Sequence, residues 1–324
     1  MHQPYRAPLW LPGGHAQTLY AALAAPRPRV AYRRERWDTP DGDFIDLDWT
    51  KKQDQGPRIK DQGKTPLVVL FHGLEGSSRS HYALALMAAV RDAGWRGVVV
   101  HFRGCSGELN RLPRAYHSGD SAEVNWVLRR LKRSNSALHA IGVSLGGNAL
   151  LKWLGETGAA AGSVVDRAAA VSAPVDLTAA GNALDRGFNR VYVRQFLFTM
   201  KRKALEKLKH HPGLYDAARV RAAYTLREFD DTVTAPLHGF SGVDDYWARA
   251  SSKPWLRGID VPVLVVNARD DPFLPSGALP ALNEVAPSVL LEQPAGGGHV
   301  GFVSGRFPGN LAWLPRRVLE YFSE

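Results

Sequence analysis

Short apolar runs alternate with stretches of helical periodicity over most of the chain, and this alternation limits the fold more than any other feature of the sequence. Each run has the length of a strand, and the first, residues 67–71, has the composition of a strand that is buried on both faces. The runs cover residues 67–71, 97–102, 137–143, 168–172, 261–267 and 288–293. Strands that alternate with helices form parallel β-α-β units. The sequence therefore predicts an α/β fold with a mostly parallel, doubly wound sheet flanked by helices.

The segments between the runs supply the expected helices. Residues 80–93 are followed by Gly94, which suits the position just after a helix. Asp120 and Glu123 can form a capping box that begins a helix ending near residue 133. Further helices are expected over residues 145–154, 276–285 and 310–322.

The N-terminal part of the chain lacks the alternating pattern. Residues 1–35 are rich in Pro and Arg, so we expect an irregular N-terminal arm. Apolar and polar residues alternate toward the end of residues 36–50, and Pro, Asp and Gly at 40–42 supply a turn, so this segment is expected to form a hairpin. Residues 51–65 are polar and are expected to form a loop.

A second departure from the pattern lies between the fourth and fifth apolar runs. Residues 176–260 are too long for a crossover connection, and residues 189–209 have helical character. We expect this segment to form a helical cap over one end of the sheet. The predicted organisation is one core domain, residues 1–175 and 261–324, with the cap inserted at 176–260.

The composition is that of an ordinary globular protein rather than of a disulfide-linked or membrane-spanning one. Hydrophobic residues make up 45% of the 324 residues and charged residues 22%, as in ordinary globular proteins. Cys105 is the only cysteine, so no intrachain disulfide can form, and this is consistent with a reducing compartment. We expect no secretory signal, because the first residues lead into no continuous apolar stretch, and no apolar run approaches the roughly 20 residues that span a bilayer. We therefore expect a cytoplasmic protein.

The strongest chemical signal is Gly-Val-Ser-Leu-Gly-Gly at residues 142–147. It matches G-x-S-x-G, with a predicted strand before it and a predicted helix after it, which is the context of a nucleophile elbow. Such a turn would present the hydroxyl of Ser144 at the carboxyl edge of the sheet. The backbone amide of Leu145, at the start of the helix, could then stabilise an oxyanion. The alternative is a glycine-rich turn that holds an inert serine.

A serine hydroxyl needs a base, and in proteins with this elbow the chain order is Ser, then Asp or Glu, then His. His299 follows the last predicted strand inside a glycine-rich loop and is the candidate base. The orienting acid is Asp270 or Asp271, just past the run 261–267. The other of these two carboxylates would cap the turn.

The loop after residues 67–71 reads His-Gly-Leu-Glu-Gly-Ser and is expected to supply a second oxyanion donor. The amide just after His-Gly is the usual donor, which is Leu74 here. His72 is interpreted as a structural anchor of the loop. Glu75 could touch a polar substrate group, although a hydrogen bond within the loop is the favoured interpretation.

Positive charge is concentrated in the predicted cap. Of the net charge of +10, a large part falls within residues 186–211, which hold eight Lys and Arg and one Glu, Glu206. The cationic residues are Arg186, Arg190, Arg194, Lys201, Arg202, Lys203, Lys207 and Lys209. Apolar residues interleave with them, so the segment could contact an anionic membrane or an anionic head group. A cap helix with its charges in water is the favoured alternative, and nucleic-acid binding would rest on charge alone.

Several motifs in one order carry a resemblance to a known family. They are the segments 72–77, 102–107, 142–147, 270–272 and 297–302, with further similarity at 13–18 and 244–247. Together they resemble the YheT-like branch of the α/β-hydrolases over nearly the whole chain. The resemblance implies the α/β-hydrolase fold, Asp271 as the acid, and a triad of Ser144, Asp271 and His299. It also implies cleavage of carboxylic esters, which in eukaryotic relatives include phospholipid acyl esters.

The resulting hypothesis is a serine hydrolase that acts on small-molecule or lipid esters without a cofactor or a metal. Thioester or amide hydrolysis with the same triad is one alternative, and a catalytically silent lipid-binding module is another. Cys105 is interpreted as a packing thiol. His210 and His211 lack further ligands at metal-binding spacing, and the glycines 296–298 lack the dinucleotide-binding pattern.

Overall fold

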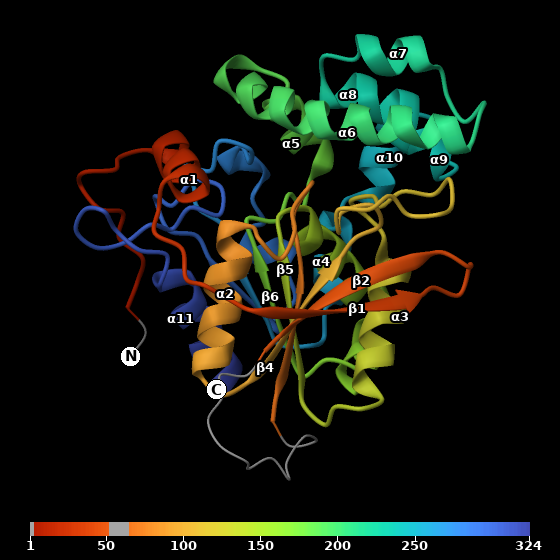
Figure 1. Ribbon diagram of the computed structural model, residues 1–324. Helices are drawn as coiled ribbons and strands as arrows, with labels where there is room; N and C mark the ends of the chain where they lie inside the picture. Colours follow the sequence, from red (N-terminus) through yellow and green to blue (C-terminus); the bar gives the residue numbers. More distant parts are fainter. Residues whose placement is uncertain (1–2, 52–64) are drawn as a thin grey trace.

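The computed structural model describes residues 3–51 and 65–324, and the expected loop at 51–65 lies almost entirely outside the described residues. An eight-stranded sheet with the order β1-β2-β4-β3-β5-β6-β7-β8 forms the centre of the molecule (Figure 1). The strands β3 to β8 are parallel, while β1 pairs antiparallel with β2 and β2 with β4. The strands are β1 Tyr32–Asp38, β2 Phe44–Thr50, β3 Leu67–Phe71, β4 Arg96–His101, β5 Leu138–Val143, β6 Arg167–Val171, β7 Val263–Val266 and β8 Val289–Glu292.

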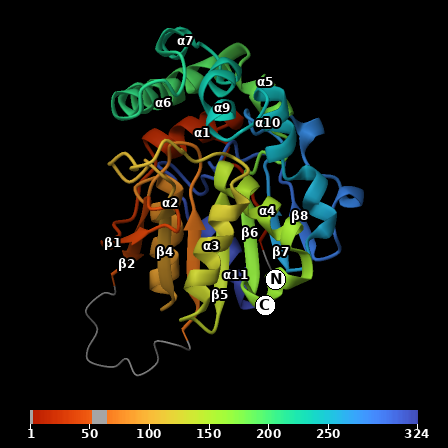
Figure 2. The same ribbon diagram turned by 90° about the vertical axis from the view of Figure 1, so that its right-hand side faces the viewer.

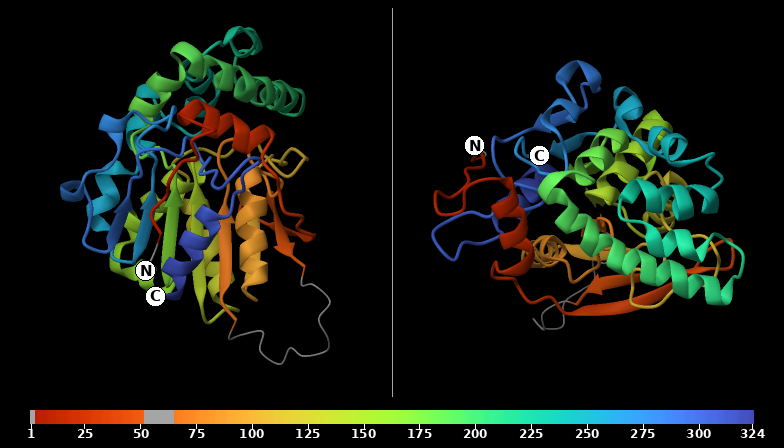
Figure 3. Two further views of the ribbon diagram at one scale, coloured as in Figure 1. Left: turned by 90° about the vertical axis from the view of Figure 1, so that its left-hand side faces the viewer. Right: turned by 90° about the horizontal axis from the view of Figure 1, so that it is seen from above.

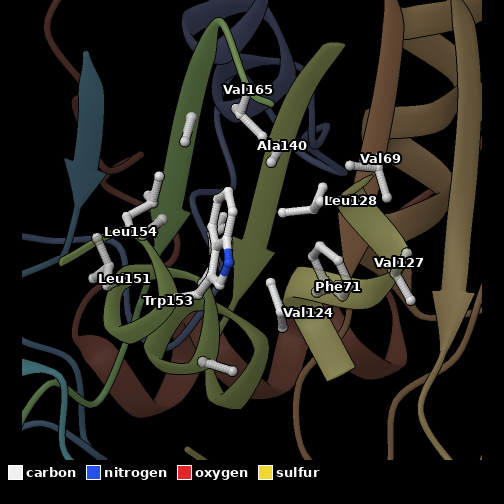
Figure 4. Close-up of a cluster of buried hydrophobic side chains, with 14 of the residues drawn as sticks. Val69, Phe71, Val124, Val127, Leu128, Ala140, Leu151, Trp153, Leu154 and Val165 are labelled. Carbon is white, nitrogen blue, oxygen red and sulfur yellow. The ribbon is translucent and has the colours of Figure 1, made fainter. Parts of the chain in front are cut away.

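Helices cover both faces of the sheet, as the alternating pattern predicts. Helices α3 (Ser121–Lys132) and α4 (Leu145–Thr157) pack on one face, and α2 (His81–Asp92) and α11 (Trp313–Ser323) pack on the other (Figures 1 and 2). Alternate residues of each central strand enter two separate apolar clusters, because successive side chains of a strand point to opposite faces. Figure 4 shows one cluster, in which Trp153 of α4 lies among Leu128, Ala140 and Val165.

Two sequence predictions for the C-terminal half need correction. Residues 276–285 form no α-helix but two short 3₁₀ turns, Ser276–Ala278 and Leu282–Glu284. Pro280 lies between the turns and cannot donate the backbone hydrogen bond that a continuous helix needs. Helix α11 begins at Trp313, three residues later than the predicted start.

The predictions for the N-terminal half also need correction. Residues 1–35 are not wholly irregular, because α1 (Gly14–Leu23) is a ten-residue helix and β1 already begins at Tyr32. The capping box at Asp120 is only half formed. The Asp120 carboxylate accepts the amide of Glu123, whereas the Glu123 carboxylate binds the Arg103 guanidinium at 2.6 Å.

A layer of helices lies over the carboxyl ends of the parallel strands (Figures 1 and 3). It has an apolar cluster of its own, distinct from the two clusters of the sheet. Its members are α5 Leu177–Leu184, α6 Arg190–His210, α7 Ala217–Ala222, α8 Leu226–Phe229, α9 Ala235–Leu237 and α10 Val243–Ala250, with a single π-helical turn at Asp230–Thr234. Within the described residues, no helix is long and apolar enough to cross a membrane.

Candidate active site

Ser144 occupies a strained turn between β5 and α4. Its φ of 52° lies in the left-handed region, which non-glycine residues rarely adopt. The glycines on either side are required by contact: a Cβ at Gly142 would meet the backbone of Gly146, and one at Gly146 would meet the carbonyl of Phe71. The sequence prediction of an elbow after a strand and before a helix is therefore realised in the backbone.

The imidazole of His299 joins Ser144 to a buried carboxylate. His299 Nε2 lies 2.9 Å from Ser144 Oγ, and His299 Nδ1 lies 2.9 Å from Asp271 Oδ2. A carboxylate can only accept, so Nδ1 carries the ring proton and Nε2 is free to accept the serine proton. The Asp271 Oδ1 atom accepts the amide of Phe273 at 2.8 Å, and the Phe273 ring stacks on the imidazole with 4.1 Å between centroids. Both neighbours restrict the orientation of the imidazole.

The structure separates the two adjacent aspartates. Asp271 faces His299, whereas Asp270 Oδ1 accepts the backbone amide of Gly298 at 2.9 Å. Asp270 thus ties the turn after β7 to the glycine-rich loop that carries His299. Burial is the main reason why the pKa of Asp270 is raised above its ordinary value.

The loop after β3 places its backbone against Ser144. A Cβ at Gly73 would lie 3.0 Å from Ser144 Cβ, so only glycine allows this approach. The carbonyl of Gly73 accepts from the Gly76 amide at 2.9 Å and from His72 Nδ1 at 2.8 Å. Because a peptide unit is planar and trans, the Leu74 amide then points away from those donors. In the described parts of the chain, the Leu74 and Leu145 amides donate to no other residue.

His72 itself is a structural anchor, as the sequence suggests. Its Nε2 atom accepts the Phe102 amide at 3.1 Å, while Nδ1 donates to Gly73. Full burial is the main cause that lowers the pKa of His72 to about 3, so the ring stays neutral. Cys105 is buried as well, and burial raises the pKa of its thiol to about 12, which opposes a role as a nucleophile.

Helix α1 contributes residues to the site that sequence reasoning missed. The Thr18 hydroxyl accepts the backbone amide of His299 at 2.8 Å, and Gln17 Oε1 accepts the amide of Val303 at 2.9 Å. A Cβ at Gly14 would overlap the carbonyl of Asp270, so the helix approaches the site closely. In the sequence, segment 13–18 contributes only to the family resemblance, and it carries no local pattern that predicts this long-range contact.

A cavity of about 740 Å³ extends from Ser144 and His299 beneath the helical layer. Its lining is mostly apolar, and it includes Leu74, Leu177, Leu184, Phe196, Met200, Phe229, Val233 and Trp247. Leu23 of α1 and Val191 of α6 also line it, and they are 77% and 54% exposed. The cavity therefore opens to the surface between α1 and α6, which lie next to each other (Figure 2).

Ionisable side chains also line this cavity, among them Lys203, Lys207 and Asp230. Lys203 and Lys207 of α6 point toward the core, so the expectation that all cap charges lie in water is wrong for these two. Lys207 donates to Asn110 Oδ1 and to two carbonyl oxygens, which makes it a tie between layers, and burial lowers its pKa to about 8. Burial also raises the pKa of Asp230 to about 6. Across residues 3–51 and 65–324, no group of three or more His, Cys, Asp or Glu could hold a metal ion.

Comparisons with known proteins agree with this architecture. A family model described as the alpha/beta hydrolase fold matches residues 66–305. The chain is 39% identical to "Putative esterase YheT" of Escherichia coli (strain K12) over 95% of this chain and 90% of that protein. The chain belongs to the α/β-hydrolase family, in its YheT-like branch.

A further relative and one solved structure agree with this assignment. It is 32% identical to human phospholipase ABHD3, over 98% of this chain and 78% of that protein. An esterase from Exiguobacterium antarcticum has the same fold, with a TM-score of 0.56 and 17% identity over 89% of this chain and 99% of that one. The sequence prediction of the fold class and of the family is confirmed, and a hydrolase of the esterase type is supported.

The contact between Thr18 and His299 can be tested by substitution. We predict that Thr18→Val lowers kcat for a p-nitrophenyl ester about tenfold, because the backbone of His299 loses its acceptor and the imidazole shifts. Thr18→Ser keeps the hydroxyl and should remain within about twofold of the parent chain. Thr199→Val, on the cap helix α6, is the matched control. Equal activities of Thr18→Val and Thr199→Val would contradict this role.

Proposed function

We propose that this protein is a serine hydrolase that cleaves carboxylic esters through an acyl-enzyme intermediate. The observation that carries the proposal is the position of His299, hydrogen-bonded to Ser144 on one nitrogen and to Asp271 on the other. This arrangement activates a serine hydroxyl by general base catalysis.

Each step of the reaction uses a group already in position. His299 Nε2 takes the proton of Ser144 as Oγ attacks the ester carbonyl, and Asp271 stabilises the imidazolium that forms. The amides of Leu74 and Leu145 hold the oxyanion of the tetrahedral intermediate. His299 then protonates the leaving alcohol. Water, deprotonated by His299, attacks the acyl-enzyme, and His299 returns the proton to Ser144 Oγ as the bond to the acyl group breaks and the acid is released. None of these steps uses a metal or a cofactor.

Lipid esters, including phospholipid acyl esters, are the substrate class that we propose. A mostly apolar cavity of about 740 Å³ beside Ser144 can bury an acyl chain, because removing apolar surface from water is favourable. Two proteins similar to this chain, human phospholipase ABHD3 and monoacylglycerol lipase of Saccharomyces cerevisiae, are named for acyl lipids. Thioester or amide cleavage would use the same triad, and a panel of matched activated substrates separates the three bonds. The remaining alternative is a catalytically silent lipid-binding module.

The proposed core and cap correspond to different layers of the structure. We propose that residues 1–175 and 261–324 act as the catalytic core and that residues 176–260 act as a cap. The core carries Ser144, Asp271 and His299, while the cap supplies most of the apolar side chains of the cavity.

The role of the serine gives the first prediction. Ser144→Ala should lower kcat/KM for p-nitrophenyl esters by at least about 10⁴-fold, because the nucleophile is lost while the oxyanion amides remain. A chain-length series from acetate to dodecanoate identifies the acyl preference, and the apolar cavity predicts a rise in kcat/KM with chain length. Ser163→Ala, at an exposed serine far from the elbow, serves as the control. Undiminished hydrolysis by Ser144→Ala would support the binding-module alternative.

We further propose that the cap touches anionic membrane surfaces beside the cavity opening. Exposed apolar residues of this region, Leu23, Phe188, Val191 and Phe198, lie on or next to α1 and α6. Exposed cations accompany them and form no ion pair within the described residues: Arg186, Arg190, Arg194 and Arg202. Apolar anchors with a cationic stripe are typical of interfacial helices. A lipid ester could then enter the cavity directly from the bilayer.

Vesicle binding tests this contact. The parent chain should bind vesicles with anionic lipid more tightly than neutral ones, and the difference should shrink as salt rises. The double variant Arg190→Gln/Arg194→Gln should weaken anionic binding at least about tenfold, since each arginine near the surface contributes about 1 kcal/mol. Arg129→Gln/Arg133→Gln, on the flank helix α3 and the residue after it, is the control with equal charge loss. Equal binding to both vesicle types would refute the proposal.

A further inference from the structure

Glu75 has a backbone conformation that needs external support. It directly follows Leu74, the proposed oxyanion donor, and its φ of 54° is rarely adopted by residues other than glycine or asparagine. Such conformations persist only where the surroundings hold them in place. Glu75 is also largely buried, with a side chain that is 9% exposed. A buried carboxylate next to the reacting centre therefore calls for an explanation.

Two residues hold Glu75, and one of them belongs to the cap. The Glu75 amide donates to the Tyr116 hydroxyl at 2.9 Å, and that hydroxyl donates back to Glu75 Oε1 at 2.8 Å. The Lys203 ammonium, from the middle of α6, lies 2.9 Å from the same carboxylate. Within residues 3–51 and 65–324, Lys203 is the only cation that forms an ion pair with Glu75.

These contacts fix the peptide on both sides of Leu74. On the N-terminal side, the carbonyl of Gly73 is held by Gly76 and His72. On the C-terminal side, Tyr116 holds the Glu75 amide, and Lys203 holds the carboxylate that closes this ring of hydrogen bonds. The direction of the Leu74 amide thus depends on a side chain supplied by the cap.

We propose that the ion pair between Glu75 and Lys203 is a positioning latch, through which the seated cap helix α6 sets the oxyanion-binding amide of Leu74. The latch rests on the proposed function, because it assigns a role to the oxyanion loop of that reaction. When α6 moves away from the core, Glu75 loses its cation in a buried site, where an unpaired charge is unfavourable. The loop then relaxes, and the oxyanion donor is lost. The cap therefore couples its own closure to the assembly of the catalytic site.

Lys203 and Glu75 would behave differently if they formed a subsite for a substrate head group. A subsite contributes binding energy to the ground state and to the transition state, so its loss raises KM. A latch for the oxyanion donor acts in the transition state, so its loss lowers kcat. A short substrate such as p-nitrophenyl acetate, which lacks a head group, separates these two roles.

The kinetic test compares Lys203→Met, Glu75→Gln and the double variant on p-nitrophenyl acetate. We expect each single variant to lower kcat about tenfold, with KM changed less than about twofold, because the oxyanion amide is displaced rather than removed. The double variant should be no worse than the singles, since both break one interaction. Lys203→Arg should recover most of the activity. The control is Lys209→Met, at an exposed lysine of the same helix that pairs with Glu206.

Amide hydrogen exchange without substrate tests the latch independently of catalysis. Peptides that contain residues 73–76 should exchange about fivefold faster in Lys203→Met than in Lys209→Met, because local opening becomes easier. Three results for Lys203→Met would each overturn the proposal. They are unchanged exchange in this loop, a kcat within about twofold of the parent chain, and an effect confined to KM. If Ser144→Ala kept full activity, the proposed serine mechanism would be refuted. The exchange data would still show whether Lys203 holds the loop.

Discussion

The hydrogen-bonded bridge formed by the His299 imidazole is the interaction on which the rest of the structure depends. It joins three segments that are far apart in the sequence: the elbow at Ser144, the turn at Asp271 and the loop of His299 itself. Each nitrogen of the ring has one partner at 2.9 Å, so a small shift of any segment would break the relay. The parallel sheet makes the bridge feasible, because the carboxyl ends of β5, β7 and β8 meet at one edge.

Backbone strain is concentrated around this bridge. Among the described residues, five non-glycine residues have a positive φ: Glu75, Ser144, Ser172, Val300 and Phe302. Two of them support each other, since Ser172 Oγ accepts the amide of Val300 at 3.0 Å. Strained conformations cost about 1–3 kcal/mol each and occur mostly where function requires them. Contacts from α1 and from the cap, through Thr18 and Lys203, offset part of this cost by fixing the loops in place.

The sequence is informative where structure depends on local pattern. The run that forms β3 is apolar throughout, and those of β5 and β6 are mostly apolar, because both faces of a central strand are buried. This pattern is visible in the sequence alone. Motif and chain order predict Ser144 and His299 and leave Asp270 or Asp271 as the acid, which only the family resemblance narrows to Asp271. The structure brings the side chains of Ser144, Asp271 and His299 together. The helix expected at 276–285 failed because Pro280 outweighs the apolar spacing around it.

Side-chain contacts between segments that are far apart in the sequence could not be predicted from local sequence patterns. Nothing near Thr18 in the sequence shows that its hydroxyl meets the amide of a residue 281 positions away. In the sequence, Lys203 is one of eight cationic residues in the segment 186–211, and its inward direction depends on the packing of α6 over the core. The favoured interpretation of Glu75 as a residue bonded within its own loop was wrong for the same reason, because Tyr116 and Lys203 hold it.

The central claim is that His299 activates Ser144 as a nucleophile. Labelling with a fluorophosphonate probe, followed by mass-spectrometric mapping of the modified peptide, tests this claim most directly. The account predicts one covalent adduct on Ser144, formed by the parent chain and by Ser163→Ala but strongly reduced in His299→Ala. An unlabelled parent chain, or an adduct on another residue, would contradict it.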